Sequence, residues 1–265
     1  MSHPVVTGLR SADADERVAA CQQAVEDPAA VLFVDALIEA LGDPVREVFR
    51  AACDALATLA RQHDVTRPLR EALHEGSARR RVGSALTLTR LEPPDLRLIP
   101  ALVGGLGLDD GKLRWRALKA LVETGRLHGE VLPVLVGLAG SDGNAVVRRM
   151  ACHGLRELGR DDPAASLALL TGTRDPDVAA RRAAYAALAS QLDPPREVLI
   201  RLVAALDDEP DGACRRIATV ALGEIGARLP ERLDPDARRA LVRARDQADD
   251  PDLRRGAARA LERAG

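Results

Sequence analysis

Aromatic side chains are scarce in this sequence, because its 265 residues include one Trp, one Tyr and two Phe. Apolar residues nevertheless make up 46% of the chain, so the core must consist mainly of Ala and Leu. A conventional enzyme of this length usually buries more rings, since aromatic side chains dominate the energetics of most cores. Their scarcity favours helices that stack closely through small side chains.

Lysine is almost as rare, because only Lys112 and Lys119 are lysines among 38 basic residues. Two explanations stay open, a GC-rich coding bias or a preference for guanidinium groups. The formal net charge of −2 gives no overall field that attracts nucleic acid or a membrane. No apolar run reaches the roughly 18 residues of a membrane span. The start, MSHPVVTGLRS, has neither the basic nor the apolar segment of a signal peptide.

The cysteines lack the CxxC spacing of metal or redox sites. Cys21, Cys53, Cys152 and Cys214 are far apart in the sequence, and three of them occupy equivalent positions of a repeat. Stacked helices lie about 10 Å apart, whereas a disulfide spans about 7 Å at most between Cα atoms. We therefore expect reduced, buried thiols in a cytoplasmic protein of bacterial type.

An apolar anchor recurs along the chain at intervals of 30 to 39 residues, which is typical of two-helix repeats. The anchors are Leu56, Leu86, Leu121, Leu155, Leu188, Leu222 and Leu261, and Ala24 extends the series. A small or short side chain stands four positions earlier, at Ala20, Ala52, Val82, Ala117, Ala151, Ala184, Ala218 and Ala257. Turns rich in Asp, Pro and Gly precede these helices and predict where each begins.

The pattern predicts an all-α protein, an α-solenoid (superhelix) of about eight helix pairs in one continuous domain over residues 1–265. No strand-like alternation occurs. The expected units are 1–27, 28–62, 63–92, 93–127, 128–160, 161–193, 194–230 and 231–265. Their expected first helices are 5–9, 28–41, 66–73, 98–106, 130–139, 163–171, 195–206 and 235–248.

The run D-P-D-V-x-x-R-R-x-A-x-x-A-L at Asp175 to Leu188 resembles HEAT repeats, especially the short type named after phycobilisome lyases. The same signature returns at Asp142 to Leu155 and at Asp208 to Leu222. The resemblance covers nearly the whole chain and implies the fold. It does not imply one function, because this family includes scaffolds, chromophore-lyase subunits, a hydroxylase and DNA glycosylases.

One row of arginines stands seven positions before the anchors, in seven of eight units. The row is Arg17, Arg79, Arg114, Arg148, Arg181, Arg215 and Arg254, with Phe49 in the remaining unit. Repeats of the HEAT-like type pair such an arginine with a turn aspartate, and Asp43, Asp142 and Asp175 stand six positions before the row. The resemblance thus implies a structural ladder through the stack. At Phe49 we expect Arg46 or Arg50 to substitute.

A second row stands one position later and points away from the anchors. It reads Val18, Arg50, Arg80, Trp115, Arg149, Arg182, Arg216 and Arg255, and Lys119, His153 and Glu157 share its exposed stripes. Arginine in the first turn of a helix opposes the helix dipole. Either these arginines offset the acidic turns, or they form a groove for a carboxylate-bearing partner. Trp115 is either a hot-spot residue of that groove or a ring half-buried between helices.

No catalytic or metal-binding constellation is evident. His74-Glu75 resembles the His-Glu pairs of a HEAT-like di-iron hydroxylase, but that site needs several such pairs on successive repeats. A glycosylase-like protein would combine a basic face with aromatic residues that cradle a base, and the rings are missing. No phosphate loop or G-x-S-x-G motif occurs, so we expect neither metal nor cofactor.

The hypothesis is a non-enzymatic scaffold that binds an acidic segment of another protein on its second-helix, concave face. The predicted binding residues are Arg50, Arg80, Trp115, Lys119, Arg149, His153, Glu157, Arg182, Arg216 and Arg255. Two alternatives stay open, a DNA-binding or glycosylase-like HEAT protein and an accessory subunit of a chromophore lyase.

Overall fold

The chain is helical throughout the residues that the computed structural model describes, 3–264. Within that range it has sixteen α-helices and three short 3₁₀ turns, and none of these helices is long and apolar enough to cross a membrane. The chain divides into two compact units, one ending at His128 and one beginning at Gly129. One continuous domain over the whole chain stays a prediction.

The first unit contains eight helices that pack as four successive pairs. They are α1 (Pro4–Leu9), α2 (Ala14–Glu26), α3 (Val34–Ala40), α4 (Arg46–Leu59), α5 (Thr66–Glu71), α6 (Ala78–Leu91), α7 (Ile99–Gly105) and α8 (Gly111–Leu127). The 3₁₀ turns Ala30–Phe33 and Leu96–Leu98 precede α3 and α7. The expected helix 28–41 therefore begins with the tighter geometry that is frequent at helix termini.

The second unit also contains four successive helix pairs. They are α9 (Val131–Ser141), α10 (Ala145–Leu158), α11 (Pro163–Gly172), α12 (Val178–Leu188), α13 (Arg196–Asp208), α14 (Gly212–Arg228), α15 (Pro235–Gln247) and α16 (Pro251–Arg263). The 3₁₀ turn Pro230–Arg232 precedes α15. The first helices expected at 163–171, 195–206 and 235–248 thus differ from the observed ones by at most two residues at either end.

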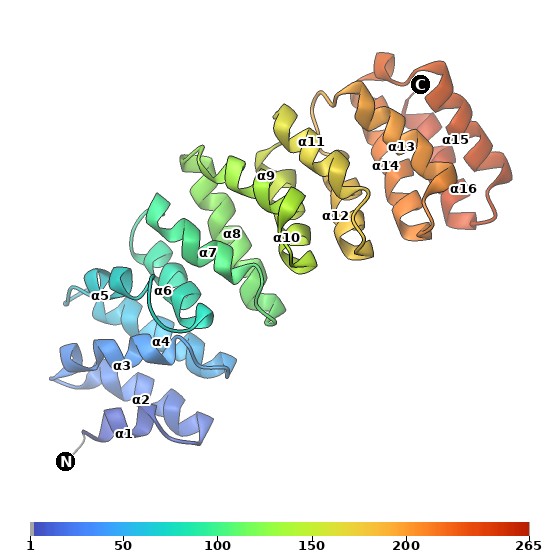
Figure 1. Cartoon of the computed structure of the whole chain (residues 1–265). Coiled ribbons are helices and arrows are strands. Elements are labelled where there is room, and N and C mark those ends of the chain that lie inside the picture. Colours follow the sequence, from blue (N-terminus) through green and yellow to red (C-terminus); the bar gives the residue numbers. More distant parts are fainter. Residues whose placement is uncertain (1–2, 265) are drawn as a thin grey trace. The chain divides into compact units, whose positions relative to one another are not determined.

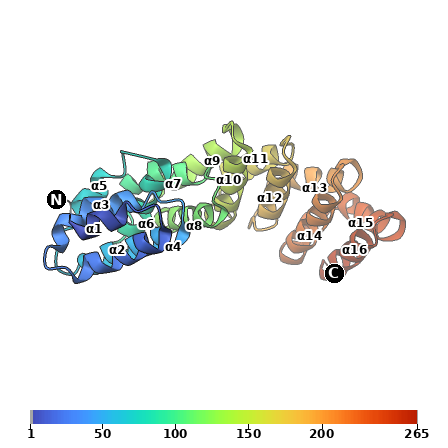
Figure 2. The ribbon, with the colours of Figure 1, turned by 90° about the horizontal axis from the view of Figure 1, so that it is seen from below.

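Within each unit the helices form two layers (Figures 1 and 2). In the second unit, α9, α11, α13 and α15 pack in series as the first-helix layer, and α10, α12, α14 and α16 pack in series as the second-helix layer. In the first unit, α2, α4, α6 and α8 likewise pack in series as the second-helix layer. Helix pairs that stack in chain order in this way form an α-solenoid, the predicted fold class.

Aspartates at the turns determine where several second helices begin. The side chain of Asp110 accepts backbone N–H bonds from Lys112 and Leu113, both at 3.0 Å. Asp211 and Asp250 cap α14 and α16 in the same way. Such caps satisfy backbone donors that have no partner within the helix.

Small residues allow the helices of a layer to approach closely. The small positions predicted from the repeat, such as Ala117, Ala151 and Ala184, are fully buried. Gly223 of α14 lies so near α16 that an added Cβ atom would be 2.9 Å from both the Cα and the Cβ atom of Ala260. The glycine is therefore required by the spacing between these two helices.

We expect Gly223→Ala to lower the free energy of unfolding by about 1 to 3 kcal/mol, because the added methyl group overpacks the α14–α16 contact. Gly137→Ala is the matched control, since a Cβ atom at this position of α9 meets nothing within 4 Å. The control should raise stability by about 0.5 to 1 kcal/mol through helix propensity. Urea unfolding followed by circular dichroism measures both. Equal stability of the two variants would refute the close approach.

Candidate functional site

The first arginine row connects consecutive helix pairs, as Arg148 of α10 illustrates. Its Nε and Nη2 atoms donate to the carboxylate of Asp175 at 2.6 and 2.7 Å. Its Nη1 atom donates to the backbone carbonyl of Asp142 at 2.8 Å. One planar guanidinium group thus binds the turn of its own helix pair and the turn of the next pair.

Two other arginines repeat this arrangement. Arg17 binds the carboxylate of Asp43 at 2.7 Å and donates to the carbonyl of Ser11 at 2.9 Å. Arg181 binds Glu209 at 3.2 Å and donates to the carbonyl of Asp175 at 2.9 Å. In all three cases the carbonyl stands six residues before the arginine, and the acid stands six residues before the next row position.

Glu209 was not predicted as a ladder residue, although it follows the same rule. It stands six residues before Arg215, and that spacing is the signal that identifies it. Its carboxylate is buried between Arg181 and Arg201, the latter at 3.6 Å. The hydroxyl of Tyr185 donates to Glu209 at 3.2 Å and accepts from Arg201 at 2.6 Å. Burial raises the pKa of Tyr185 above its usual value, so the phenol stays a neutral donor.

Phe49 interrupts the ladder in a different way from the one predicted. Neither Arg46 nor Arg50 forms an ion pair with any residue of the range 3–264, so the expectation that one of them substitutes is wrong. Phe49 is buried, and the guanidinium groups of Arg79 and Arg116 lie 5.8 and 5.3 Å from its ring centroid. The ring thus occupies the site with apolar and cation–π contacts, which need no acid.

The remaining ladder residues are placed differently. Arg79 binds Asp110 at 3.0 Å, and Arg114 donates to the carbonyl of Leu108. The carboxylate of Asp142 accepts from the backbone N–H of Asn144 at 2.7 Å. Two further row members, Arg215 and Arg254, form no side-chain hydrogen bond or ion pair with a described residue. The ladder is therefore discontinuous.

Most arginines of the second row are bound by carboxylates of the same chain. Arg182 binds Asp211 at 2.7 Å, and Arg216 binds Asp250 at 2.6 Å. These guanidinium groups lower the pKa of both aspartates. Arg80 binds Glu39, and Arg255 binds Asp252. The explanation that these arginines offset acidic turns therefore describes Arg182 and Arg216, whereas Glu39 lies within α3 and Asp252 within α16.

The other members of the second row differ in exposure and in contacts. Arg50 and Arg149 have no ion pair or hydrogen bond from their side chains to the described chain. Trp115 is 51% exposed, and Lys119 lies 4.0 Å from Glu123. The pKa of His153 is lowered by burial and then by its arginine neighbours, which disfavours the charged imidazolium. Glu157 is exposed on the same helix.

A groove on the second-helix layer surrounds Arg50. It lies between α2 and α4 and has a volume of about 260 Å³. Its lining consists of Val18, Gln22, Arg46, Glu47, Arg50, Ala51 and Asp54. Arg46 was not among the predicted site residues, but it stands four residues before Arg50 and so shares its helix face. Asp54 is held by Arg90 at 2.9 Å.

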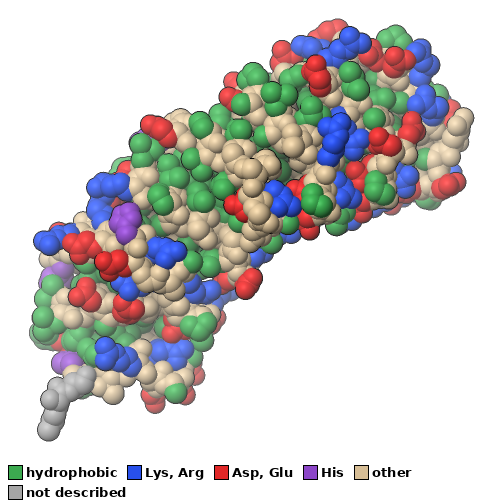
Figure 3. Space-filling view, viewed as in Figure 1, with side chains coloured by type: hydrophobic (Ala, Val, Ile, Leu, Met, Phe, Trp, Pro, Cys, Tyr) green, Lys and Arg blue, Asp and Glu red, His purple; other side chains and the backbone are tan. Residues whose placement is uncertain are grey.

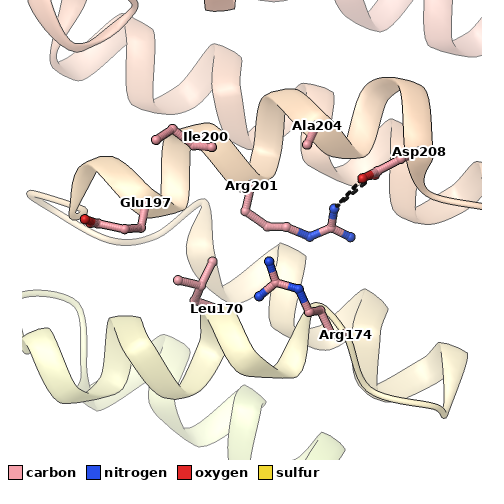
Figure 4. A pocket seen from close by; sticks show the side chains of 7 residues that line it. All are labelled: Leu170, Arg174, Glu197, Ile200, Arg201, Ala204 and Asp208. Carbon is pink, nitrogen blue, oxygen red and sulfur yellow. Dashed lines mark hydrogen bonds and ion pairs between the residues drawn. The ribbon is translucent and has the colours of Figure 1, made fainter.

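Two adjoining grooves on the first-helix layer of the second unit were not predicted. One lies between α11 and α13 and has a volume of about 520 Å³ (Figure 4). In it, Arg174 and Arg201 face each other beside Leu170, and Arg201 binds Asp208 at 3.0 Å. The other, of about 610 Å³, lies between α13 and α15. Exposed Ile200 borders both, and Figure 3 shows hydrophobic and charged side chains intermixed on this face.

A family model described as HEAT repeats matches residues 98–173 and 166–262, more than half of the chain. The chain belongs to the HEAT-repeat family. HEAT-repeat solenoids are typically protein-interaction scaffolds and are generally not catalytic. The short phycobilisome-lyase type of HEAT repeat stays a prediction.

Solved structures are similar to this chain over nearly its whole length. A crystal structure of importin beta is similar over 99% of this chain, with 17% identity and a TM-score of 0.63. This chain covers only 40% of that protein, and the likeness shows the fold alone. An engineered protein is similar over 98% of this chain and 94% of its own, with 19% identity and a TM-score of 0.44. No curated protein matches the chain.

Reactive groups are not gathered in the part of this HEAT chain that the structure describes. No set of three or more His, Cys, Asp or Glu side chains between residues 3 and 264 is placed to hold a metal ion. All four cysteines are buried free thiols, and burial raises the pKa of Cys21, Cys152 and Cys214 to about 12. Thiols with such pKa values are poor nucleophiles at pH 7.

The ladder of the HEAT units makes stability depend on pH through Asp175. Its hydrogen bonds with Arg148 lower the pKa of Asp175 in the folded protein. The stabilisation is complete above the unfolded pKa of about 3.9 and is lost as the pH falls through the lower folded pKa. We expect Asp175→Asn to cost about 1.5 to 3 kcal/mol at pH 7, and the difference from wild type to shrink below about pH 3.9.

Urea unfolding of both proteins between pH 3 and pH 7 measures this dependence. Asp161→Asn is the control, because Asp161 is exposed and has no side-chain hydrogen bond to the described chain. The control should match wild type at every pH. A destabilisation by Asp175→Asn that is equally large at pH 3 would contradict the assignment.

Proposed function

We propose that this protein is a non-enzymatic scaffold that binds an acidic segment of another protein on its second-helix layer. Membership of the HEAT-repeat family supports the general role. The arginine contacts support the choice of an acidic partner and of this binding face. A cytoplasmic location, expected from the reduced thiols, stays a prediction.

The observation that carries the proposal is the groove between α2 and α4. Arg46 and Arg50 line it, and neither guanidinium is bound by an acid of the described chain. A carboxylate on a partner can therefore accept two hydrogen bonds from one guanidinium without displacing an existing ion pair. Val18 and Ala51 supply an apolar floor for the rest of the segment.

In the second unit Arg149 of α10 has the same property, because its side chain forms no ion pair with a described residue. The arginines of the second row that already have an acid contribute less to partner binding. A partner carboxylate at Arg182 or Arg216 would have to replace Asp211 or Asp250. The exchange would give little net gain, since one charge-assisted contact replaces another. We therefore assign partner binding to Arg46, Arg50 and Arg149.

Acids within the groove restrict the partner further. Glu47 and Asp54 line the same groove as the two arginines. A uniformly acidic tract would meet like charges at both positions, which is unfavourable. The segment that fits best has acidic residues spaced among neutral ones, with carboxylates at Arg46 and Arg50.

The double variant Arg46→Glu/Arg50→Glu should bind an acidic peptide at least about tenfold more weakly than wild type, because charge-assisted hydrogen bonds are lost. The probe is a fluorescein-labelled 12-residue peptide with Glu at every fourth position among Ala and Gln. Fluorescence anisotropy at two salt concentrations gives the affinity, and binding should weaken at higher salt.

The matched control is Arg61→Glu/Arg67→Glu, which reverses the same number of charges at exposed positions outside the groove. It should bind the peptide about as well as wild type, and both variants should keep the wild-type helicity. The proposed site is excluded if both double variants bind alike, or if a peptide with Gln in place of Glu binds equally well.

A further inference from the structure

The ladder rule leads to a residue other than an acid for two arginines. For Arg79 it leads to Leu108, but Asp110 takes that role, so Arg215 is the one without a replacement. In the three complete contacts the acid stands six residues before the next row position, at Asp43, Asp175 and Glu209. The same offset after Arg215 leads to Ala248, six residues before Arg254. An alanine has no group that accepts a hydrogen bond from a guanidinium.

The backbone at Ala248 is nevertheless that of a ladder acid. Ala248 is the C-cap residue of α15, with φ −65° and ψ 138°, and Glu209 is the C-cap residue of α13, with φ −77° and ψ 120°. The two residues share one position and one conformation, so only the carboxylate is missing at Ala248.

The side chain of Arg215 has no acceptor for its Nε atom. That atom is buried and has no hydrogen-bond partner, which is also the case for the Nε atom of Arg114. In the complete contacts, Nε is the atom that donates to the acid, as in Arg148 with Asp175. A buried donor without an acceptor is unfavourable, because it gives up water and gains nothing in return.

A cavity of about 320 Å³ opens at this point. Arg215 and Ala248 line it, and Leu206 and Leu253 contribute apolar surface. It lies within the second unit, between the end of α13, α14 and the turn that joins α15 to α16. The volume exceeds that of one carboxylate group.

Nearby acids do not fill the place of the missing one. Asp207 binds Arg243 at 3.2 Å, and Asp250 binds Arg216. Asp249 also lines the cavity, but it is exposed and forms no ion pair with the described chain. These acids disfavour a doubly charged ligand such as phosphate, since like charges repel at short range. A single carboxylate is the anion that suits the cavity.

We propose that Arg215 binds the side-chain carboxylate of an Asp or Glu on an extended segment of a partner protein. That residue completes the ladder contact that Ala248 leaves open. The inference does not rest on the proposed function, because the Arg46–Arg50 groove lies in the other unit. Either site can fail without the other.

Nuclear magnetic resonance of the arginine Nε–H groups in the full-length protein tests the site. Arg215→Lys assigns the signal of Arg215 by removing it. The probes are the capped tripeptides acetyl-Gly-Asp-Gly-amide and acetyl-Gly-Asn-Gly-amide. We expect the Asp peptide to shift the Arg215 signal in a saturable way and the Asn peptide to leave it unchanged.

The variants Ala248→Asp and Ala248→Glu supply the missing acid from within the chain. Each should shift the Arg215 signal without peptide and raise the unfolding temperature. Each should also weaken the binding of the Asp peptide by about tenfold or more. Two variants are used because the acids of the ladder include both lengths, Asp175 and Glu209. Arg46→Glu/Arg50→Glu should leave the Arg215 response to the peptide unchanged.

The proposal is overturned if the Arg215 signal of the wild type does not respond to the Asp peptide, or if the Asn peptide produces the same response. It is also overturned if Asp249→Asn alone shifts the Arg215 signal in the absence of peptide, because Asp249 would then already occupy the site.

Discussion

The guanidinium group that joins one helix pair to the next is the interaction on which the repeat arrangement depends. It makes three directed contacts in one plane: Nη1 donates to a carbonyl of its own turn, and Nε and Nη2 donate to an acid of the following turn. An ammonium group cannot reproduce this geometry, because it has no donor that corresponds to Nε. The scarcity of lysine at these positions thus has a physical reason, whatever the coding bias of the genome.

The helix pairs and the first arginine row could be predicted because each depends on offsets within one helix and its preceding turn. Small residues four positions before the anchors are buried at Ala117, Ala151 and Ala184. The direction of a side chain on a helix follows from its position in sequence. These features need no knowledge of the neighbouring pair.

The contacts that were missed cross from one pair to the next. Arg181 meets Glu209, which is 28 residues later, and Arg182 meets Asp211, which is 29 residues later. Turn lengths vary among units, so these partners are not evident before the stack is built. The grooves beside Ile200 were missed for a related reason, because they depend on how neighbouring helices diverge. That Ile200 of α13 is exposed beside both grooves is evident only from the structure.

Phe49 and Leu73 show what this connectivity means for exchange between repeats. Phe49 replaces a ladder arginine, and Leu73 replaces the acid six residues before the next row position. The charged contact is divided between two successive helix pairs, and Phe49 and Leu73 stand at the equivalent positions of two successive pairs. A segment transplanted at helix-pair boundaries would leave half of such a contact behind at both of its ends. Grafts between repeats should instead be cut just before the arginine, in the first turn of the second helix. Each arginine then stays on the same segment as the acid that follows it.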